Sequence, residues 1–355
     1  VRGLGVRPAV SILKPLCGAD DHLEANLETF FALDYPRFEL VFGVEDDTDP
    51  AVAVVRRLRA RFPDVRARLL IHDGKRALNP KVSNLRAMLE QGAHDLVVIS
   101  DSNVSVDANY VSTLVAEFTA DPAVGVVTNI FVGVGEQTLG ATLENLHLAG
   151  PVAGGVAITA VHGKSAVSVG KSMMFHRSVF ARLGGFSSVA SLLAEDYVMG
   201  RMFAEAGYRV RVCTTTIRNV CARTTVKTFL MRHLRWGLIR SRLAPLMYPL
   251  EPLFNPMATA IIVAVLGVPG TLALAWGVGL TLLRDGLQWT RLRGRKGLLA
   301  ALPLGPAKEL LTLGVWAVAP FLRHVQWRDR RYRVGIGTRL YAAQPMEAPE
   351  QLTSE

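Results

Sequence analysis

The architecture of this chain follows from one short stretch, Leu96-Val97-Val98-Ile99-Ser100-Asp101-Ser102-Asn103, in which four apolar residues lead directly into an acid and an amide. A short apolar run without alternation is typical of a strand buried on both faces. Comparable runs occur on both sides of it, separated by segments with helical periodicity. Strands are predicted at 9–13, 39–44, 67–71, 96–99 and 124–131, and helices at 49–61, 82–91 and 108–118. This repetition predicts an α/β fold with a parallel sheet covered on both faces.

Polar residues follow several of these strands, at the end of the sheet where such folds bind their ligands. Asp101 is suited to hold a divalent metal, which needs a hard oxygen ligand on a loop, although an Asp there also caps turns. Asp46 is suited to bind a nucleotide base or ribose, or else supports the N-terminus of the next helix, where Asp49 is the expected N-cap. Lys81 begins a helix after Asn79 and Pro80, so it either binds a diphosphate or is a solvated lysine.

The segment from 135 to 220 is less regular. We expect a glycine-rich loop at 150–155 and a further strand at 168–175. The pair Gly184-Gly185 predicts a turn before a helix that opens with Glu195 and Asp196. Paired carboxylates can raise one another's pKa, which makes Asp196 a candidate general base; a helix-start carboxylate without a catalytic role is the alternative.

The next amphipathic helix is predicted at 226–241 and carries Arg232-His233-Leu234-Arg235-Trp236. Arg232 and Arg235 are three residues apart and therefore share a helix face, where both could hold a diphosphate. Trp236 could add a flat apolar wall for a sugar or lipid. A basic helix lying on lipid headgroups is the competing interpretation.

The last third of the chain is strongly apolar. No charge occurs from 257 to 283, and a Gly267-Val268-Pro269-Gly270 break favours a helical hairpin over a single crossing. The apolar stretch 298–322 carries Lys308 and Glu309 at its middle, which favours a lipid-embedded or interfacial helix. The 40 basic residues exceed the 30 acidic ones by ten, and many flank these apolar stretches, at 284–296 and 323–333. That pattern is typical of a membrane protein with its basic residues on the cytoplasmic side, and it argues against a nucleic-acid partner.

Asp46, Asp101, Asp196 and Arg232-x-x-Arg235-Trp236 resemble, in order and spacing, the three aspartates and the (Q/R)xxRW signature of lipid and processive glycosyltransferases. The sequence resembles the ceramide glucosyltransferase family more closely still, over about residues 9 to 335. This similarity is carried by Val10-Ser11-Ile12-Leu13-Lys14-Pro15-Leu16, residues 26–36, Asn79-Pro80-Lys81, Ala141-Thr142-Leu143-Glu144, Ala194-Glu195-Asp196-Tyr197 and residues 327–333.

The resemblance implies a GT-A fold, a UDP-sugar donor (UDP-glucose in the family), Mg²⁺ or Mn²⁺, and an inverting transfer to a lipid such as ceramide. It implies that Asp46 contacts uridine, Asp101 the metal and diphosphate, and Asp196 the acceptor hydroxyl, with Lys81, Arg232, Arg235 and Trp236 around the donor. One departure bears on the substrates. The family's Ser-His-Pro-Arg segment, with its active-site histidine, corresponds here to Gly150-Pro151-Val152-Ala153-Gly154.

These observations predict a catalytic domain at 1–245, membrane-embedded or interfacial helices at 246–335 and a tail at 336–355. The arginine-rich composition is typical of a bacterial protein, so we expect the catalytic domain on the cytoplasmic face of an inner membrane. The chain begins at Val1, which leaves open whether an N-terminal span precedes it. The alternative enzyme is a bacterial glycosyltransferase that transfers N-acetylglucosamine from its UDP derivative to a hopanoid or other lipid. A polysaccharide synthase, a nucleotidyltransferase and a non-enzymatic membrane-surface protein fit the pattern less well.

Overall fold

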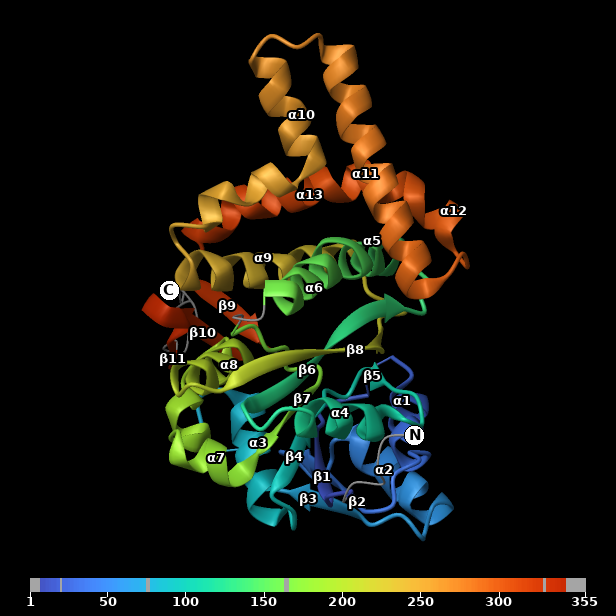
Figure 1. Ribbon diagram of the computed structural model, residues 1–355, viewed down its shortest axis with the longest axis vertical. Helices are drawn as coiled ribbons and strands as arrows, with labels where there is room; N and C mark the ends of the chain where they lie inside the picture. The colour runs from blue at the N-terminus through green and yellow to red at the C-terminus, as the bar shows by residue number, and fades with distance from the viewer. Residues whose placement is uncertain (1–6, 20, 75–76, 163–165, 328–329, 343–355) are drawn as a thin grey trace, which may run out of the picture.

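A computed structural model of the chain describes residues 7–19, 21–74, 77–162, 166–327 and 330–342. Its centre is an eight-stranded sheet with the order β3-β2-β1-β4-β7-β6-β8-β5 (Figure 1). The bounds of its strands are β1 Val10–Pro15, β2 Phe38–Val44, β3 Ala67–Ile71, β4 Leu96–Ile99, β5 Val104–Ser105, β6 Val124–Val134, β7 Met173–His176 and β8 Arg209–Val220.

The strands predicted at 9–13, 39–44, 67–71, 96–99 and 124–131 all run in the same direction, as predicted, but the complete sheet is mixed. Strands β1 to β4 run parallel as predicted, but β7 lies antiparallel between β4 and β6. The strand predicted at 168–175 is shortened to Met173–His176. A strand's direction depends on whether the preceding connection starts the strand at the same end of the sheet or crosses to the opposite end. Short-range sequence periodicity does not record this.

Helices cover both faces of the sheet, and each face has its own apolar core. Helices α1, α2 and α4 pack on one face, and α3, α7 and α8 pack on the other. Asp49 caps α2 as predicted, since its side chain accepts a hydrogen bond from the N–H of Ala51. The bounds are α1 Leu23–Phe31, α2 Pro50–Arg61, α3 Pro80–Gln91, α4 Tyr110–Thr119, α7 Arg177–Arg182 and α8 Glu195–Glu205, with a 3₁₀ turn η2 at Gly185–Val189.

The glycine-rich segment 150–155 is helical, which corrects the predicted loop. Helix α5 (Leu139–His147) continues through the π-helical turn η1 (Leu148–Val152) into α6 (Ala153–His162). A Cβ on Gly150 would lie 3.1 Å from an Asp285 carboxylate oxygen, and one on Gly154 would lie 2.8 Å from the Gln288 amide nitrogen. The glycines therefore permit the close approach of another helix, and no loop is needed to explain them.

The C-terminal third begins with α9 (Val226–Leu243), close to the predicted bounds. After a 3₁₀ segment, η3 (Tyr248–Phe254), helices α10 (Pro256–Val265) and α11 (Gly270–Arg293) form the predicted hairpin, which projects from the molecule (Figure 1). Gly267, in the turn between them, has a φ of 101°, a conformation that glycine adopts at little cost.

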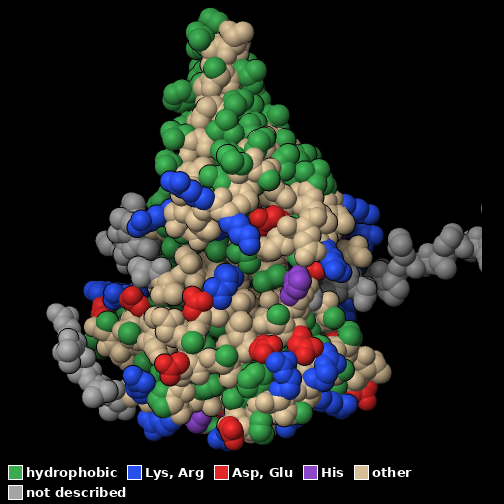
Figure 2. Space-filling view, turned by 90° about the vertical axis from the view of Figure 1, so that its right-hand side faces the viewer, with side chains coloured by type: hydrophobic (Ala, Val, Ile, Leu, Met, Phe, Trp, Pro, Cys, Tyr) green, Lys and Arg blue, Asp and Glu red, His purple; other side chains and the backbone are tan. Residues whose placement is uncertain are grey.

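The hairpin surface is apolar and exposed. Figure 2 shows hydrophobic side chains over the projection and basic side chains near its foot. The exposed apolar residues of α10, the turn and α11 are Ile261, Ile262, Val265, Leu266, Val268, Leu272, Leu274, Trp276, Leu280, Leu283 and Leu287. Such an extended exposed apolar surface is unusual for a protein wholly surrounded by water.

The segment that follows lies across the foot of the hairpin. It contains α12 (Leu298–Ala301), η4 (Leu302–Leu304), α13 (Gly305–Val318) and η5 (Ala319–Phe321). Within the described residues, Leu298–Phe321 is the one helical stretch with the length and hydropathy of a membrane span. Lys308, at its middle, is fully buried and its Nζ lies 2.6 Å from an Asp285 carboxylate oxygen of α11. Neighbouring Glu309 pairs with Arg284 of α11 at 2.6 Å, so two ion pairs link α13 to α11.

The chain then forms a three-stranded antiparallel sheet of β9 (His324–Trp327), β10 (Arg330–Val334) and β11 (Leu340–Ala342). Its apolar residues share a core with Leu193 and with Leu238 of α9. These strands occupy part of the region predicted as membrane helices, and β11 falls in the predicted tail; Arg328 and residues 343–355 lie outside the described residues.

Candidate active site

Asp101 lies just beyond the carboxyl end of β4, as predicted, between two lysines. Its Oδ1 is 2.9 Å from the Nζ of Lys81, and its Oδ2 is 3.1 Å from the Nζ of Lys171. Burial alone would raise the pKa of Asp101, but the charges of the two lysines outweigh it and the pKa lies well below its usual range. The Nζ of Lys14, on the neighbouring strand β1, donates to the Asp101 carbonyl oxygen at 2.5 Å. Asp101 is therefore ionised and surrounded by cations.

Lys81 belongs to the first turn of α3, where Asn79 is the N-cap and Pro80 the first helical residue. Its Nζ also lies 3.2 Å from an oxygen of Glu195, a buried residue of α8. Burial lowers the pKa of Lys81, but Asp101, Glu195 and Asp196 outweigh that effect and raise it. The lysine therefore stays charged, and it links the strand end to the start of α8.

Asp196 is held at the start of α8 by backbone donors. Its Oδ2 accepts the N–H of Gly170 at 2.8 Å, and its Oδ1 accepts the N–H of Tyr197 at 2.8 Å. A Cβ on Gly170 would lie 2.6 Å from the Nζ of Lys81 and 3.1 Å from Asp196 Oδ2. Asp196 and Lys81 therefore flank the same glycine, and the structure brings Asp101, Lys81 and Asp196 into one cluster.

Glu195 differs from its neighbour Asp196 in its environment. It is buried and accepts a hydrogen bond from the Asn79 side chain at 3.2 Å. Burial raises the pKa of Glu195, and Lys81 opposes that shift. The charge of Asp196 also raises the pKa of Glu195, as expected of paired carboxylates, and of the two acids only Asp196 is partly exposed.

Helix α9 carries the two arginines of the predicted motif. Arg232 pairs at 2.9 Å with Glu144 of α5, a fully buried carboxylate. Burial lowers the pKa of Arg232, but Glu144 outweighs that effect and raises it. For Arg235, burial and the charge of Arg232 lower the pKa, while Glu195 and Asp101 oppose this, so Arg235 interacts electrostatically with the carboxylate cluster. Trp236 packs against the main core and lies edge-on to His233, with ring centroids 5.0 Å apart.

Asp46 follows β2, two strands away from β4 in the sheet order. Its carboxylate is exposed and accepts hydrogen bonds at 2.8 Å from the N–H and the hydroxyl of Thr48. These bonds lower the pKa of Asp46, which therefore remains a charged acceptor at the carboxyl edge of the sheet. The assignment of Asp46 to a nucleotide stays a prediction.

Three residues of this cluster were absent from the sequence-based site: Lys14, Glu144 and Lys171. Lys14 and Glu144 occur in the stretches that carry the family resemblance, which was a usable signal. Lys171 follows Gly170 in an irregular segment without such a signal. Its contact with Asp101 arises only from the fold.

The donor set determines how a divalent metal could bind here. In the part of the chain that the structure describes, no group of three His, Cys, Asp or Glu side chains is arranged to hold a metal. Asp101 supplies one carboxylate, and Mg²⁺ is commonly bound through one or two carboxylates together with substrate phosphates. The residues therefore fit a metal that is shared with a bound diphosphate.

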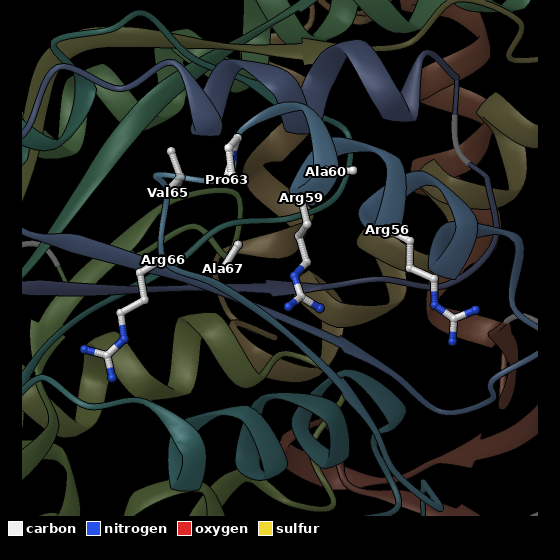
Figure 3. Close-up of a pocket in the computed structure, with 7 residues that line it drawn as sticks. All are labelled: Arg56, Arg59, Ala60, Pro63, Val65, Arg66 and Ala67. Atoms are coloured by element: carbon white, nitrogen blue, oxygen red, sulfur yellow. The ribbon is translucent and has the colours of Figure 1, made fainter.

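A separate hollow lies at the opposite edge of the sheet, near the C-terminal end of α2 and the start of β3 (Figure 3). The Arg56, Arg59 and Arg66 side chains at this hollow extend in different directions in Figure 3 and do not converge on a common point. The hollow therefore has no evident part in the carboxylate site.

Comparison with known proteins defines the class. The solved structure of a mannosyltransferase from Pyrobaculum calidifontis, in complex with GDP-mannose and Mn²⁺, is 21% identical with a TM-score of 0.56, covering 89% of this chain and 88% of that one. The likeness shows a shared fold, the GT-A fold of glycosyltransferases. The model of glycosyl transferase family 21 matches residues 3–340. This chain belongs to glycosyl transferase family 21 and is a glycosyltransferase.

Relatives within that family carry a more specific name. Ceramide glucosyltransferase 3 of Caenorhabditis elegans is 28% identical over 257 residues, 72% of this chain and 56% of the relative. Ceramide glucosyltransferase of Komagataella phaffii is 40% identical over 101 residues, 27% of this chain and 20% of the relative. The first match spans little more than half of its relative's length. The resemblance to the ceramide glucosyltransferase family is confirmed.

Proposed function

We propose that this glycosyltransferase transfers glucose from UDP-glucose to the hydroxyl of a membrane lipid, with ceramide as the acceptor and inversion at the sugar. One observation carries the lipid acceptor: helix α9 lies between the carboxylate cluster and the apolar helices. Arg235 of α9 interacts with the charges of the site, and a Cβ on Gly237 of the same helix would lie 2.7 Å from Ala319 of η5. Helix α9 thus joins the charged site to the apolar C-terminal helices, and this arrangement supports an acceptor that lies in a membrane.

The chemistry requires a base, a positioned acceptor and stabilisation of a leaving diphosphate. In this proposal the acceptor oxygen attacks C1 of the sugar, Asp196 takes the hydroxyl proton, and the bond from C1 to the diphosphate oxygen breaks. Lys81 and the two α9 arginines, Arg232 and Arg235, stabilise the negative charge that develops on UDP. Asp46 binds the uridine end, and Trp236 supports the acceptor side of α9.

A divalent cation, Mg²⁺ or Mn²⁺, held between Asp101 and the donor diphosphate would neutralise charge on the leaving group. The lysines that pair with Asp101 hold its carboxylate in the ionised state that this role requires.

We place the hairpin in one leaflet of a membrane. Helix α10 has 10 residues, about 15 Å at 1.5 Å per residue, whereas the hydrocarbon core is about 30 Å thick. The hairpin therefore reaches about halfway and returns. Arg293 pairs with Glu136 and Arg330 with Glu45, so members of both basic clusters lie beside the catalytic part. By the positive-inside rule this side is cytoplasmic, in keeping with a bacterial inner membrane.

The decisive experiment identifies the lipid product. Full-length protein in membranes is incubated with radiolabelled UDP-glucose, UDP-galactose, UDP-N-acetylglucosamine or UDP-glucuronate, and the labelled lipid is analysed by mass spectrometry. We expect glucosylceramide when ceramide is supplied. Labelled N-acetylglucosamine on a hopanoid would establish the alternative, and a water-soluble polymer would refute a lipid acceptor.

Membrane attachment has its own test, flotation with phospholipid vesicles. Two single variants, Leu266→Glu and Leu272→Glu, should each abolish flotation, because both exposed side chains lie at the hairpin and a charge there opposes insertion. Ile71 is an exposed apolar residue at the far edge strand β3, and Ile71→Glu is the matched control. Equal loss of flotation in all three variants would contradict insertion through the hairpin.

A further inference from the structure

The segment from Ser168 to Lys171 connects the two carboxylates of the site. The Ser168 hydroxyl donates to the Asp196 carbonyl oxygen at 2.5 Å, and the Gly170 N–H donates to the Asp196 carboxylate. The next side chain, Lys171, extends to Asp101 instead. The segment is fixed on its other side as well, since Val169 N–H donates to the Thr128 hydroxyl at 3.1 Å. Lys171 therefore projects from a well-held backbone.

The two lysines that flank Asp101 differ in their second partners. Lys81 also pairs with the carboxylate of Glu195, at 3.2 Å. Lys171 instead donates to the neutral side-chain oxygen of Asn103, at 2.8 Å. Both lysines and Asp101 keep between 16 and 22% of their side chains exposed, so a donor can reach them.

Asp101 has two carboxylate oxygens, and each faces one ammonium group. A cation that binds Asp101 must displace at least one of them, because like charges repel at these distances. Displacing Lys171 costs less electrostatic energy than displacing Lys81. Lys171 leaves one carboxylate and a neutral amide, whereas Lys81 would leave the carboxylates of both Asp101 and Glu195. A free ammonium on a long flexible stem needs a new anionic partner, and a diphosphate supplies one.

We propose that Lys171 is a donor-binding residue that exchanges Asp101 for the diphosphate of the nucleotide sugar when a divalent cation binds. The inference rests on the proposed donor class. It assigns to Lys171 a contact that forms only in the loaded site. In the free enzyme the same lysine neutralises Asp101.

Equilibrium binding of UDP to the full-length protein in detergent, with saturating Mn²⁺ or with EDTA, tests this exchange. In Mn²⁺ we expect Lys171→Met to weaken UDP binding by about 10- to 100-fold, the loss typical of a hydrogen bond to a charged group. The loss in EDTA should be much smaller, because Lys171 then remains on Asp101. Lys171→Arg should restore most of the affinity, and Lys227→Met, at an exposed lysine of α9, should not change it.

Uridine, which has no diphosphate, separates a binding role from a structural one. Its affinity should be the same in the parent and in Lys171→Met. An equal loss for uridine and UDP, an equal loss with and without Mn²⁺, or no loss at all would each overturn the exchange. If the parent binds no UDP, the proposed donor is wrong, and binding of inorganic pyrophosphate to the same variants then decides the role of Lys171.

Discussion

Replacement of Asp196 by Asn removes the proposed base while keeping its size. In the structure this carboxylate accepts two backbone N–H groups, from Gly170 and Tyr197. An Asn side chain has one carbonyl oxygen and can satisfy one of these donors, while its amide group faces the other. The variant therefore loses one hydrogen bond to a charged acceptor and leaves one donor poorly paired.

The two consequences have different sizes. A lost hydrogen bond to a charged group costs about 1.5–3 kcal/mol, so we expect a fall of about 2 kcal/mol in the free energy of unfolding. A lost general base lowers the rate by about 10²- to 10⁴-fold, which raises the activation barrier by roughly 2.7–5.4 kcal/mol. UDP-sugar affinity should change only a few-fold, because Lys81 keeps its partners Asp101 and Glu195.

The assay compares three quantities in the parent and in Asp196→Asn: the rate of lipid labelling, the affinity for UDP-sugar and the midpoint of denaturant unfolding. The control is Glu205→Gln, which neutralises an exposed acid at the other end of the same helix. Transfer within a few-fold of the parent rate, in a folded variant that binds donor, would remove Asp196 from the mechanism.

Three further perturbations probe the surroundings of this base. Asp101→Asn should destabilise the protein at neutral pH, and the difference from the parent should vanish in acid. The low pKa of Asp101 supplies stability above about pH 3.8, and this stability is lost as the pH falls through the folded-state pKa. A constant difference in urea unfolding at every pH would contradict the ion pairs of Asp101. Gly170→Ala should displace the Lys81 ammonium and weaken UDP binding, measured by calorimetry, by about tenfold, and it should lower the free energy of unfolding by about 1–2 kcal/mol. Gly155→Ala is the control and should leave the UDP affinity unchanged, because a Cβ there would meet no other atom within 4 Å. Glu144→Gln should lower the free energy of unfolding, measured with denaturant, by about 3 kcal/mol. This is the lower end of the range for breaking a buried ion pair, because the Arg232 side chain is a quarter exposed. An unchanged free energy of unfolding would show that α9 is positioned without this pair.

Much of the architecture was readable from local patterns. The strands that end before Asp46 and Asp101, the cap at Asp49 and the helix opening at Glu195 all depend on residues within a few positions of one another. Hydrophobic periodicity and capping act over such distances, so they are legible in one sequence. The hairpin turn at Gly267 belongs to the same class, because glycine adopts its backbone conformation at little cost.

The glycines at 150–155 show where local reading fails. Their composition is typical of a loop, yet they lie in a helix, and Gly150 and Gly154 leave room for the side chains of α11. Strand β7 likewise had the right composition, but neither its bounds nor its direction was predictable. In both cases a neighbour distant in sequence decides the outcome.

The site divides in the same way. The sequence placed Asp46, Asp101 and Asp196 at strand and helix ends, and it supplied the charge and the apolar hairpin. The contacts of Lys171 with Asp101 and Asn103, and of Arg232 with Glu144, were decided by tertiary structure alone. Lys171 and Asn103 are 68 residues apart, and the two segments meet only because β7 enters the sheet beside β4. Local propensities set the elements, whereas the pairing of charges across them depends on the order and direction in which the strands assemble.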